Sequence, residues 1–283
     1  MSSANELVHV PQVERLSPTC IRILGGNPGK FTLQGTNTYI IGTGHRRILI
    51  DTGEGRPAWI ESIKATLKQE RATIESVLIS HWHLDHTGGI KDVLELLPAS
   101  KIYKCHPVDQ QQEEICDKQI FAVPGATLTA FHTPGHTADH MVFVLEEEDA
   151  MFTADNVLGQ KTAVFEDLAL YTSSLEKMRG LFNGRAYPGH GPVVDNGTSK
   201  IVEYLEHRKQ REEQVLATLK TATTGAASWS AMDIVKVVYK DVPEELYPAA
   251  CGGVVQVLSK LEGDGRILED ASGRWQLKDT SVL

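Results

Sequence analysis

The sequence is poor in cysteine and in long apolar runs. Its four cysteines, Cys20, Cys105, Cys116 and Cys251, show no paired zinc-binding or redox spacing, which favours reduced thiols in a cytosolic protein. No apolar run approaches the roughly 18–20 residues that a membrane span needs. Residues 1–14 hold two Glu and no Lys or Arg, so we expect neither a secretory signal nor an Arg-rich transit peptide. These absences predict a cytoplasmic protein with no membrane partner.

Basic residues are also in deficit. The chain has 28 Lys and Arg against 37 Asp and Glu, which gives a formal net charge of −9 and a pI near 5.7. A protein that holds RNA mainly through its phosphates is more often basic. The charge balance therefore disfavours binding of RNA mainly through its phosphates. RNA stays open as a partner, because a small basic groove can lie on an acidic surface.

Metal-binding side chains are instead concentrated in one short stretch. His81, His83, Asp85 and His86 fall within six residues, directly after the apolar run 76–80. An apolar run of this length, bounded by a polar cluster, is typical of a buried strand. Side chains in the loop that leaves a strand are held by the sheet and remain open to substrate. Imidazole and carboxylate together suit zinc, with iron and manganese as second choices.

Three further donors stand at the ends of similar strand-like runs. They are His136 after residues 126–131, Asp155 at the end of 150–155, and His190 in the Pro- and Gly-rich turn 187–192. Seven donors exceed the three or four protein ligands that one zinc ion takes. They fit two ions that share Asp155 and hold a water between them, an arrangement that activates the water and stabilises charge during a displacement.

This order of motifs resembles the metallo-β-lactamase superfamily over about residues 12 to 210. The resemblance implies a four-layer αβ/βα sandwich in the α/β class, with the site at one edge of two paired sheets. It assigns His81, His83 and His136 to a first zinc ion, Asp85, His86 and His190 to a second, and Asp155 to both. It also gives Asp51, at the end of the strand-like run 47–51, a structural role in supporting the ligand loop through hydrogen bonds.

Single residues separate the branches of that superfamily. Asp155 stands where true β-lactamases of this fold usually lack an aspartate, which disfavours β-lactam hydrolysis. His83 stands where diiron flavoproteins place a glutamate, and the interval from Asp155 to His190 is too short for the inserted domain of the RNA-processing members. Hydrolysis of an ester, thioester or phosphodiester remains, with a mononuclear-iron persulfide dioxygenase as a minor alternative.

Two segments, 25–39 and 162–168, narrow the resemblance further. They are similar to the animal β-lactamase-like protein 2, a zinc endoribonuclease, and equally to fungal lactamase-like proteins, which are thioesterases that release polyketides from an acyl carrier protein. Residues 27–31 and 150–156 resemble the fungal proteins slightly more. The leading prediction is therefore a two-zinc hydrolase of secondary metabolism. Its partner would be the acyl carrier protein of a polyketide synthase, or a small acyl thioester.

The alternative is a single-strand-selective endoribonuclease with the same metal site. In either reaction Asp85 is expected to act as the catalytic residue that holds or accepts the proton of the attacking water, besides binding metal. The turn 158–161 departs from the relatives, which usually have a small or glycine-containing turn there. Asn37 is weighed as part of the pocket lining, although ordinary turn chemistry explains it equally well. Residues 165–167 are weighed in the same way as a border of a substrate channel, whereas Trp82 is expected to pack rather than to recognise substrate.

Helical patterns alternate with the strand-like runs. Apolar faces predict helices within 59–67, 93–97, 175–182 and 201–219. The charges of the last helix alternate in sign, which indicates a solvated face rather than a nucleic-acid patch. The alternation of strands and helices supports the layered sandwich.

After about residue 198 the sequence pattern changes from alternating strands and helices to mainly helices. Two predicted helices, 231–240 and 244–261, precede a predicted hairpin within 266–277. Helices followed by such a hairpin resemble a winged-helix module, which we expect to cap the substrate cleft rather than to bind DNA. The prediction for the whole chain is a catalytic domain of the metallo-β-lactamase type over residues 1–210 and a winged-helix-like module over residues 211–283.

Overall fold

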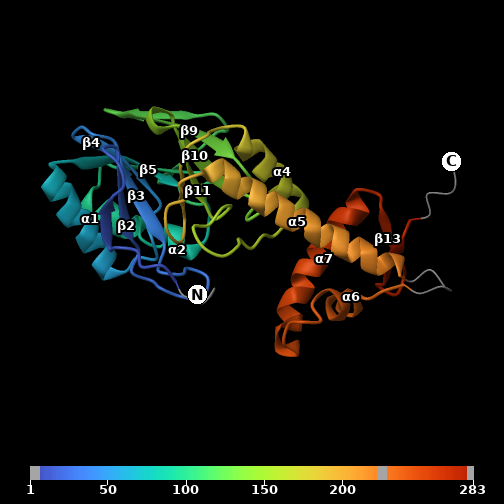
Figure 1. The fold of residues 1–283 in the computed structure, drawn as a ribbon. Coiled ribbons are helices and arrows are strands. Elements are labelled where there is room, and N and C mark those ends of the chain that lie inside the picture. Colours follow the sequence, from blue (N-terminus) through green and yellow to red (C-terminus); the bar gives the residue numbers. More distant parts are fainter. Residues whose placement is uncertain (1–6, 222–227, 279–283) are drawn as a thin grey trace.

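The protein is described by a computed structural model that covers residues 7–221 and 228–278. Two sheets lie face to face, with helices on both outer sides (Figure 1). This arrangement confirms the predicted four-layer αβ/βα sandwich. None of the helices in the two described ranges has both the length and the apolar character that crossing a bilayer requires. All four cysteine thiols are free, in agreement with their spacing.

The first sheet contains seven strands in sequence order. They are β1 (Val13–Arg15), β2 (Cys20–Leu24), β3 (Asn37–Ile41), β4 (Arg46–Ile50), β5 (Thr73–Ile79), β6 (Lys101–Lys104) and β7 (Gln112–Glu114). The first four strands pair antiparallel, and the pairs from β4 to β7 are parallel. Parallel neighbours need a crossover connection, which α1 (Pro57–Glu70) supplies before β5, and α2 (Leu84–Thr87) and α3 (Ile90–Leu96) supply before β6.

Helix α1, which covers this sheet, follows the apolar spacing of the sequence. Trp59, Ile63 and Leu67 recur every four residues and are buried against the sheet, as an amphipathic helix requires. Ala65, which lies within the predicted range 59–67 and is also apolar, is exposed. The helix ends at Arg71, whose left-handed conformation (φ 51°) turns the chain into β5.

The second sheet has the order β12-β11-β10-β9-β8. Its strands are β8 (Ile120–Val123), β9 (Ala126–His132), β10 (Met141–Leu145), β11 (Ala150–Ala154) and β12 (Ala186–Pro188), with the short 3-10 helix η1 (Glu146–Glu148) between β10 and β11. Helices α4 (Leu168–Arg179) and α5 (Gly197–Lys220) lie outside this sheet. The pattern extended α4 to Leu181 and Phe182, but the helix ends before Gly180.

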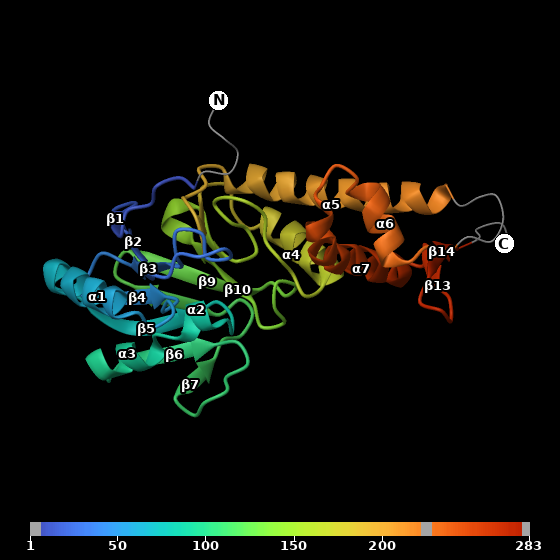
Figure 2. The same ribbon diagram turned by 90° about the horizontal axis from the view of Figure 1, so that it is seen from below.

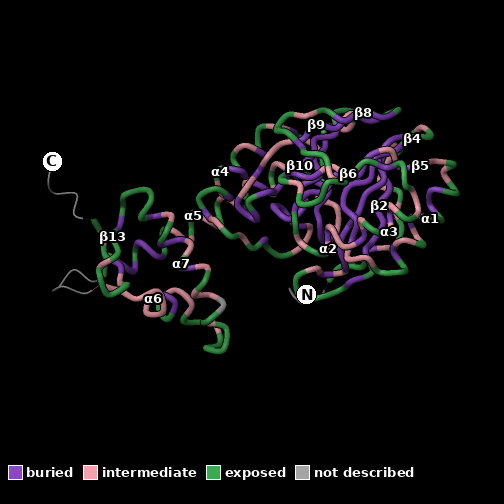
Figure 3. Tube along the Cα trace, turned by 180° about the vertical axis from the view of Figure 1, so that it is seen from behind, coloured by how far each residue is buried: buried purple, intermediate pink, exposed green. Residues whose placement is uncertain are grey.

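The core between the sheets is built around three aromatic side chains. The ring centroids of Tyr39 and Phe152 lie 5.0 Å apart, and those of Phe152 and Tyr187 lie 4.9 Å apart. These residues come from the middle of β3, β11 and β12, so the aromatic cluster joins the two sheets. In Figure 3 the buried part of the chain follows both sheets, while the outer loops are exposed. The two sheets are therefore held against each other by this core.

Helix α5 connects the sandwich to the C-terminal module (Figure 2). The module contains α6 (Ala231–Val238), the 3-10 helix η2 (Glu244–Leu246), α7 (Tyr247–Gly263), β13 (Ile267–Glu269) and β14 (Trp275–Leu277). The last two strands pair antiparallel, so the helices and the hairpin occur as predicted. The predicted boundary after residue 210 falls inside α5, and one apolar cluster extends from Val142 in β10 to Trp275 in β14. The division at 210 thus remains a prediction.

A glycine at the start of α3 permits a close approach that the fold depends on. A Cβ on Gly89 would lie 2.2 Å from the Thr52 carbonyl oxygen and 2.5 Å from the Trp59 ring. We expect Gly89→Ala to lower the free energy of unfolding by about 1–3 kcal/mol, because backbone and a buried ring would have to move. Urea denaturation measures this change.

Gly180→Ala is the matched control, because its nearest heavy atom, the Lys177 carbonyl oxygen, is 3.8 Å away. The control should change the free energy of unfolding by less than about 0.5 kcal/mol. An equal loss in both variants would contradict the role assigned to Gly89.

Candidate metal centre

The structure brings all seven predicted donors together at one edge of the two sheets. His81, His83, Asp85 and His86 follow β5, and the other three donors lie in the β9–β10 loop, after β11 and after β12. The donor atoms of His81, His83, His136 and Asp155 lie within 4.8 Å of one another, as do those of Asp85, His86 and His190. These two groups match the two sets that the sequence predicts.

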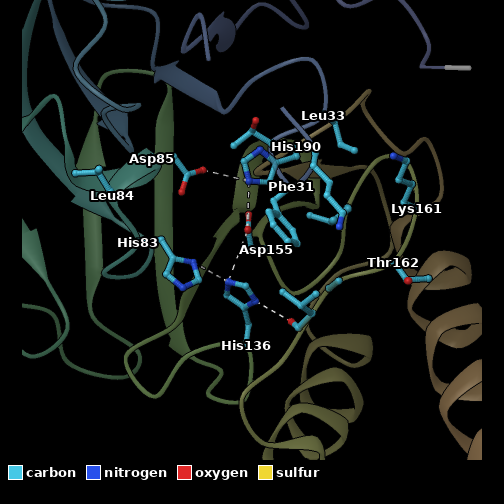
Figure 4. Close-up of a pocket in the computed structure, with 15 residues that line it drawn as sticks. Phe31, Leu33, His83, Leu84, Asp85, His136, Asp155, Lys161, Thr162 and His190 are labelled. Atoms are coloured by element: carbon cyan, nitrogen blue, oxygen red, sulfur yellow. Dashed lines mark hydrogen bonds and ion pairs between the residues drawn. The ribbon is translucent and has the colours of Figure 1, made fainter. Parts of the chain in front are cut away.

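Asp155 lies between the two groups. One of its oxygens, Oδ2, is 3.6 Å from His136 Nε2 in the first group and 3.2 Å from His190 Nε2 in the second. Its other oxygen, Oδ1, is 3.4 Å from His86 Nε2. Figure 4 shows Asp155 between His136 and His190, with Asp85 beside His190. This is the position that a ligand shared by two ions would occupy.

Each of four histidines directs its second ring nitrogen at an oxygen acceptor outside the cluster. The pairs are His81 Nδ1 with Ser80 Oγ at 2.9 Å, His86 Nδ1 with Asp51 Oδ2 at 2.7 Å, His136 Nδ1 with the Val164 carbonyl at 2.8 Å, and His190 Nδ1 with the Gly35 carbonyl at 3.5 Å. A ring nitrogen that donates outward leaves the other nitrogen with a lone pair when the imidazole is neutral. The Nε2 lone pairs of these four histidines therefore face the cluster.

The inward-facing atoms are arranged for cations. His83 Nδ1 lies 2.9 Å from His81 Nε2 and 3.2 Å from His136 Nε2, so three ring nitrogens converge on one space. His86 Nε2 and Asp155 Oδ1 are buried and have no hydrogen-bond partner among the described residues. Buried polar atoms without partners are rare and call for an explanation. The donor set fits metal ions, which would satisfy all of these atoms at once.

The carboxylates make the site negative. Burial opposes ionisation of Asp85 and Asp155, but the neighbouring His86 and His190 outweigh it and hold the pKa of both carboxyls below the usual range. Burial lowers the pKa of His81 and His83, which keeps these ligands neutral. Within residues 7–221 and 228–278, Asp85 and Asp155 form no ion pair with Lys or Arg.

Asp51 supports both groups from beneath. It is buried at the end of β4 and accepts hydrogen bonds from the Ser80 backbone N–H and from Ser80 Oγ, both at 2.8 Å. It also faces His86 Nδ1, and Ser80 Oγ in turn lies beside His81 Nδ1. One carboxylate thus orients a histidine in each group, which agrees with the structural role predicted for Asp51.

Thr36, which precedes β3, and Asn37, its first residue, support the other side of the site. Thr36 Oγ1 donates to Asp85 Oδ2 at 2.8 Å. Asn37 Nδ2 donates to the carbonyl oxygens of Pro188 and Gly191, at 2.8 and 2.9 Å. Asn37 is therefore not a channel residue, because its buried side chain fixes the turn that carries His190.

Sequence reasoning missed His140. Its buried Nε2 accepts a hydrogen bond from the Asp155 backbone N–H at 3.3 Å, and its Nδ1 faces Thr133 Oγ1 at 3.1 Å. Burial lowers the pKa of His140 well below its ordinary value, so the ring stays neutral and able to accept. No spacing signal distinguishes this histidine from the ligands, since its role depends on the neighbouring strand.

A cavity of about 320 Å³ opens onto the centre (Figure 4). It is lined by Lys30, Phe31, Thr32, Leu33, His83, Leu84, Asp85, His136, Asp155, Leu158, Lys161, Thr162, Ala163, Val164 and His190. Residues 165–167, weighed as a border of the channel, do not line this cavity, whereas Leu158 and residues 161–164 do. Asp167 instead caps α4 by accepting from the Leu170 N–H, and Phe165 stacks on Tyr171.

Trp82 does not line the cavity beside the donors. Its ring contacts that of His83 edge-on, with centroids 4.5 Å apart, although the residue is 54% exposed. It also lines a separate groove with Ile90, Leu94 and Val108. The expectation that Trp82 packs rather than recognises substrate stays a prediction.

Comparison with known families and proteins agrees with this geometry. The model of the metallo-beta-lactamase superfamily matches residues 31–104 and 107–190, and the model of the beta-lactamase associated winged helix domain matches residues 230–275. The chain is 44% identical to the atrochrysone carboxyl ACP thioesterase of Aspergillus chevalieri, over 97% of this chain and 92% of that protein. It is also 44% identical to the beta-lactamase-like protein 2 homolog of Drosophila melanogaster, over 91% of this chain and 92% of that protein.

A solved structure shares the fold over nearly the whole length. A beta-lactamase domain protein from Burkholderia ambifaria superposes with a TM-score of 0.78 at 15% identity, over 94% of this chain and 93% of that one. At this identity the likeness concerns the fold alone. It includes the C-terminal region as well as the sandwich.

The position of Asp51 gives a test of the candidate centre. Asp51→Asn removes the charge that faces His86 and Ser80, so we expect the affinity for zinc to fall about 10–100-fold. Competition with a chromophoric chelator measures this affinity. Asp195→Asn is the control for loss of one negative charge, because the Asp195 side chain is 89% exposed. Equal zinc affinity in the two variants would rule out the supporting role of Asp51.

Proposed function

Because this chain belongs to the metallo-beta-lactamase superfamily, we propose that it is a dinuclear zinc hydrolase that cleaves acyl thioesters. His81, His83 and His136 would hold one ion, Asp85, His86 and His190 the other, and Asp155 both. The observation that carries the proposal is the position of Asp155, which lies between two groups of donors beneath an apolar pocket.

Bound zinc would supply a water activated at neutral pH and positive charge beside the carbonyl oxygen. Asp85 is the carboxylate best placed to hold or accept the proton of the attacking water. Its side chain is 21% exposed, against 11% for Asp155 and 2% for Asp51. Its lowered pKa keeps it ionised, and the hydrogen bond from Thr36 fixes its orientation.

The pocket suits an acyl group. Leu33, Leu158, Ala163 and Val164 form apolar surface beside the donors, and Phe31, which is 69% exposed, stands at the mouth. Burying apolar surface favours an acyl chain over a polar substrate. A thiolate leaving group needs little protonation, so the reaction does not require a separate general acid. The site thus meets the needs of thioester cleavage with the residues present.

The relatives support a carrier-bound substrate. A protein 44% identical over most of its length is named an ACP thioesterase, and the chain reproduces nearly its full extent. We therefore propose an acyl carrier protein as the partner, with a polyketide as the acyl group and a cytoplasmic location. A small acyl thioester would be the minimal substrate.

Endoribonuclease activity is the second candidate. The identity to the Drosophila beta-lactamase-like protein 2 homolog equals that to the thioesterase, and Lys30 and Lys161 both line the pocket and are exposed. These cations offer contacts for a phosphodiester, although the net charge of −9 opposes binding of a long polyanion. The thioesterase remains the first proposal.

Zinc-loaded protein should release free thiol from acyl-coenzyme A and acyl-carrier thioesters, as measured with a thiol-reactive dye. Asp155→Asn should lower kcat at least about 10³-fold, because it weakens the ligand common to both ions. Asp195→Asn should retain the activity of the unsubstituted protein. Removing zinc with a chelator should have the same effect as Asp155→Asn.

A parallel assay with synthetic single-stranded RNA separates the two candidates. Cleavage of RNA by the zinc-loaded protein, lost in Asp155→Asn and accompanied by no thioester hydrolysis, would transfer the proposal to the endoribonuclease. If the zinc-loaded protein hydrolysed no thioester and cleaved no RNA, both proposed functions would be wrong.

A further inference from the structure

A tyrosine on α5 holds both ends of the turn that forms one wall of the pocket. The Tyr204 hydroxyl accepts a hydrogen bond from the Leu158 backbone N–H at 3.2 Å and donates to the Lys161 carbonyl oxygen at 2.9 Å. Leu158 and Lys161 both line the cavity, whereas Tyr204 is buried behind it. Lys161 has a φ of 63°, which residues with a side chain rarely adopt. The hydroxyl thus stabilises a turn that its own sequence does not favour.

The hydroxyl is suited to this double role. Burial raises the pKa of Tyr204 to about 12, so the group stays protonated and can donate while it accepts.

Arg208, one helical turn further along α5, holds the next part of the wall. Its Nη2 donates to the Ala163 carbonyl oxygen at 3.0 Å. Its guanidinium carbon lies 4.8 Å from the ring centroid of Phe165, and that ring is stacked on Tyr171. A planar cation is attracted to such a ring face. Arg208 therefore fixes the segment on both sides of Val164.

Val164 links this wall to the metal centre. Its carbonyl oxygen accepts from His136 Nδ1 at 2.8 Å, and its exposed side chain lines the cavity. The backbone from residue 158 to 165 thus carries pocket-lining side chains and contacts two donor histidines, because the Gly159 N–H also donates to the His190 carbonyl at 2.9 Å. Tyr204 and Arg208 hold it from the side of α5.

We propose that α5 determines which acyl groups fit the pocket, with Tyr204 and Arg208 as positioning residues for the wall formed by residues 158–165. This inference rests on the proposed thioesterase function, because it names the part of the site that recognises the acyl group. Neither side chain lines the cavity, so both act through the wall.

Arg211 provides a matched control on the same helix. Its guanidinium carbon lies 4.2 Å from the ring centroid of Tyr239, at the end of α6. Arg208 and Arg211 are thus both stacked on aromatic rings, and only Arg208 contacts the wall. Replacing either with Met keeps a long apolar side chain and removes the cation.

Hydrogen–deuterium exchange of the full-length, zinc-loaded protein tests the positioning directly. In Tyr204→Phe and Arg208→Met, amides within residues 158–165 should exchange about tenfold faster, which is the effect of losing one hydrogen bond. Arg211→Met should leave this segment unchanged. Unchanged exchange in both Tyr204→Phe and Arg208→Met overturns the inference, as does an equal change in Arg211→Met. If Arg208→Met does not fold, Tyr204→Phe decides alone, because it retains the buried ring.

Steady-state kinetics tests the effect on selectivity. For a long or aromatic acyl-coenzyme A, both wall variants should raise KM about tenfold and change kcat less than about threefold, because binding of the acyl group is lost without loss of the reacting groups. KM for acetyl-coenzyme A should stay the same. A uniform fall in kcat for all substrates would overturn the role in selectivity. If the unsubstituted protein cleaves no thioester, the proposed function fails, while the exchange data still decide the positioning.

Discussion

The structure depends on holding electron-rich atoms together against their mutual repulsion. Three ring nitrogens converge at His83 Nδ1, and the carboxylates of Asp85 and Asp155 lie within 3.4 Å of imidazole nitrogens in a site shielded from water. Like charges and lone pairs at such distances are unfavourable unless a cation or a proton lies between them. The aromatic cluster of Tyr39, Phe152 and Tyr187 opposes this repulsion by holding the two sheets together. Rigidity of the sandwich is therefore a requirement of the site.

Neighbouring residues orient the donors through hydrogen bonds. Asp51 faces His86 and, through Ser80, His81, while the Val164 carbonyl orients His136 and Asn37 fixes the turn of His190. These contacts come from the end of β4, from the segment after β11 and from β3. Because the supports lie on different elements, loss of one would misdirect one or two ligands rather than unfold the sheet edge. Affinity for metal is thus distributed over residues that never touch the ion.

The sequence predicts the donors and the layered fold because both depend on local signals. The seven donors stand beside short apolar runs or Pro-Gly turns, and these patterns do not require knowledge of neighbouring strands. The roles of Asn37, His140 and Tyr204 depend on contacts with residues that are far away in the sequence. Local spacing in the sequence therefore does not reveal these roles. The helix predicted within 201–219 is found as part of α5, which runs continuously through residue 210. The predicted end of α4 at residue 182 is wrong because apolar periodicity defines a helix's buried face better than its ends.

The metal-binding donors and the pocket wall are held in place by different elements. The donors are fixed by strands of the sandwich, whereas the wall at residues 158–165 is fixed by α5, which continues into the C-terminal module. A change in α5 would therefore act on the wall first, and it would reach two of the seven donors: His136, through the Val164 carbonyl, and His190, whose carbonyl accepts from the Gly159 N–H. This arrangement allows one hydrolytic centre to be combined with different substrate pockets, in keeping with the general rule that a shared fold does not fix a substrate.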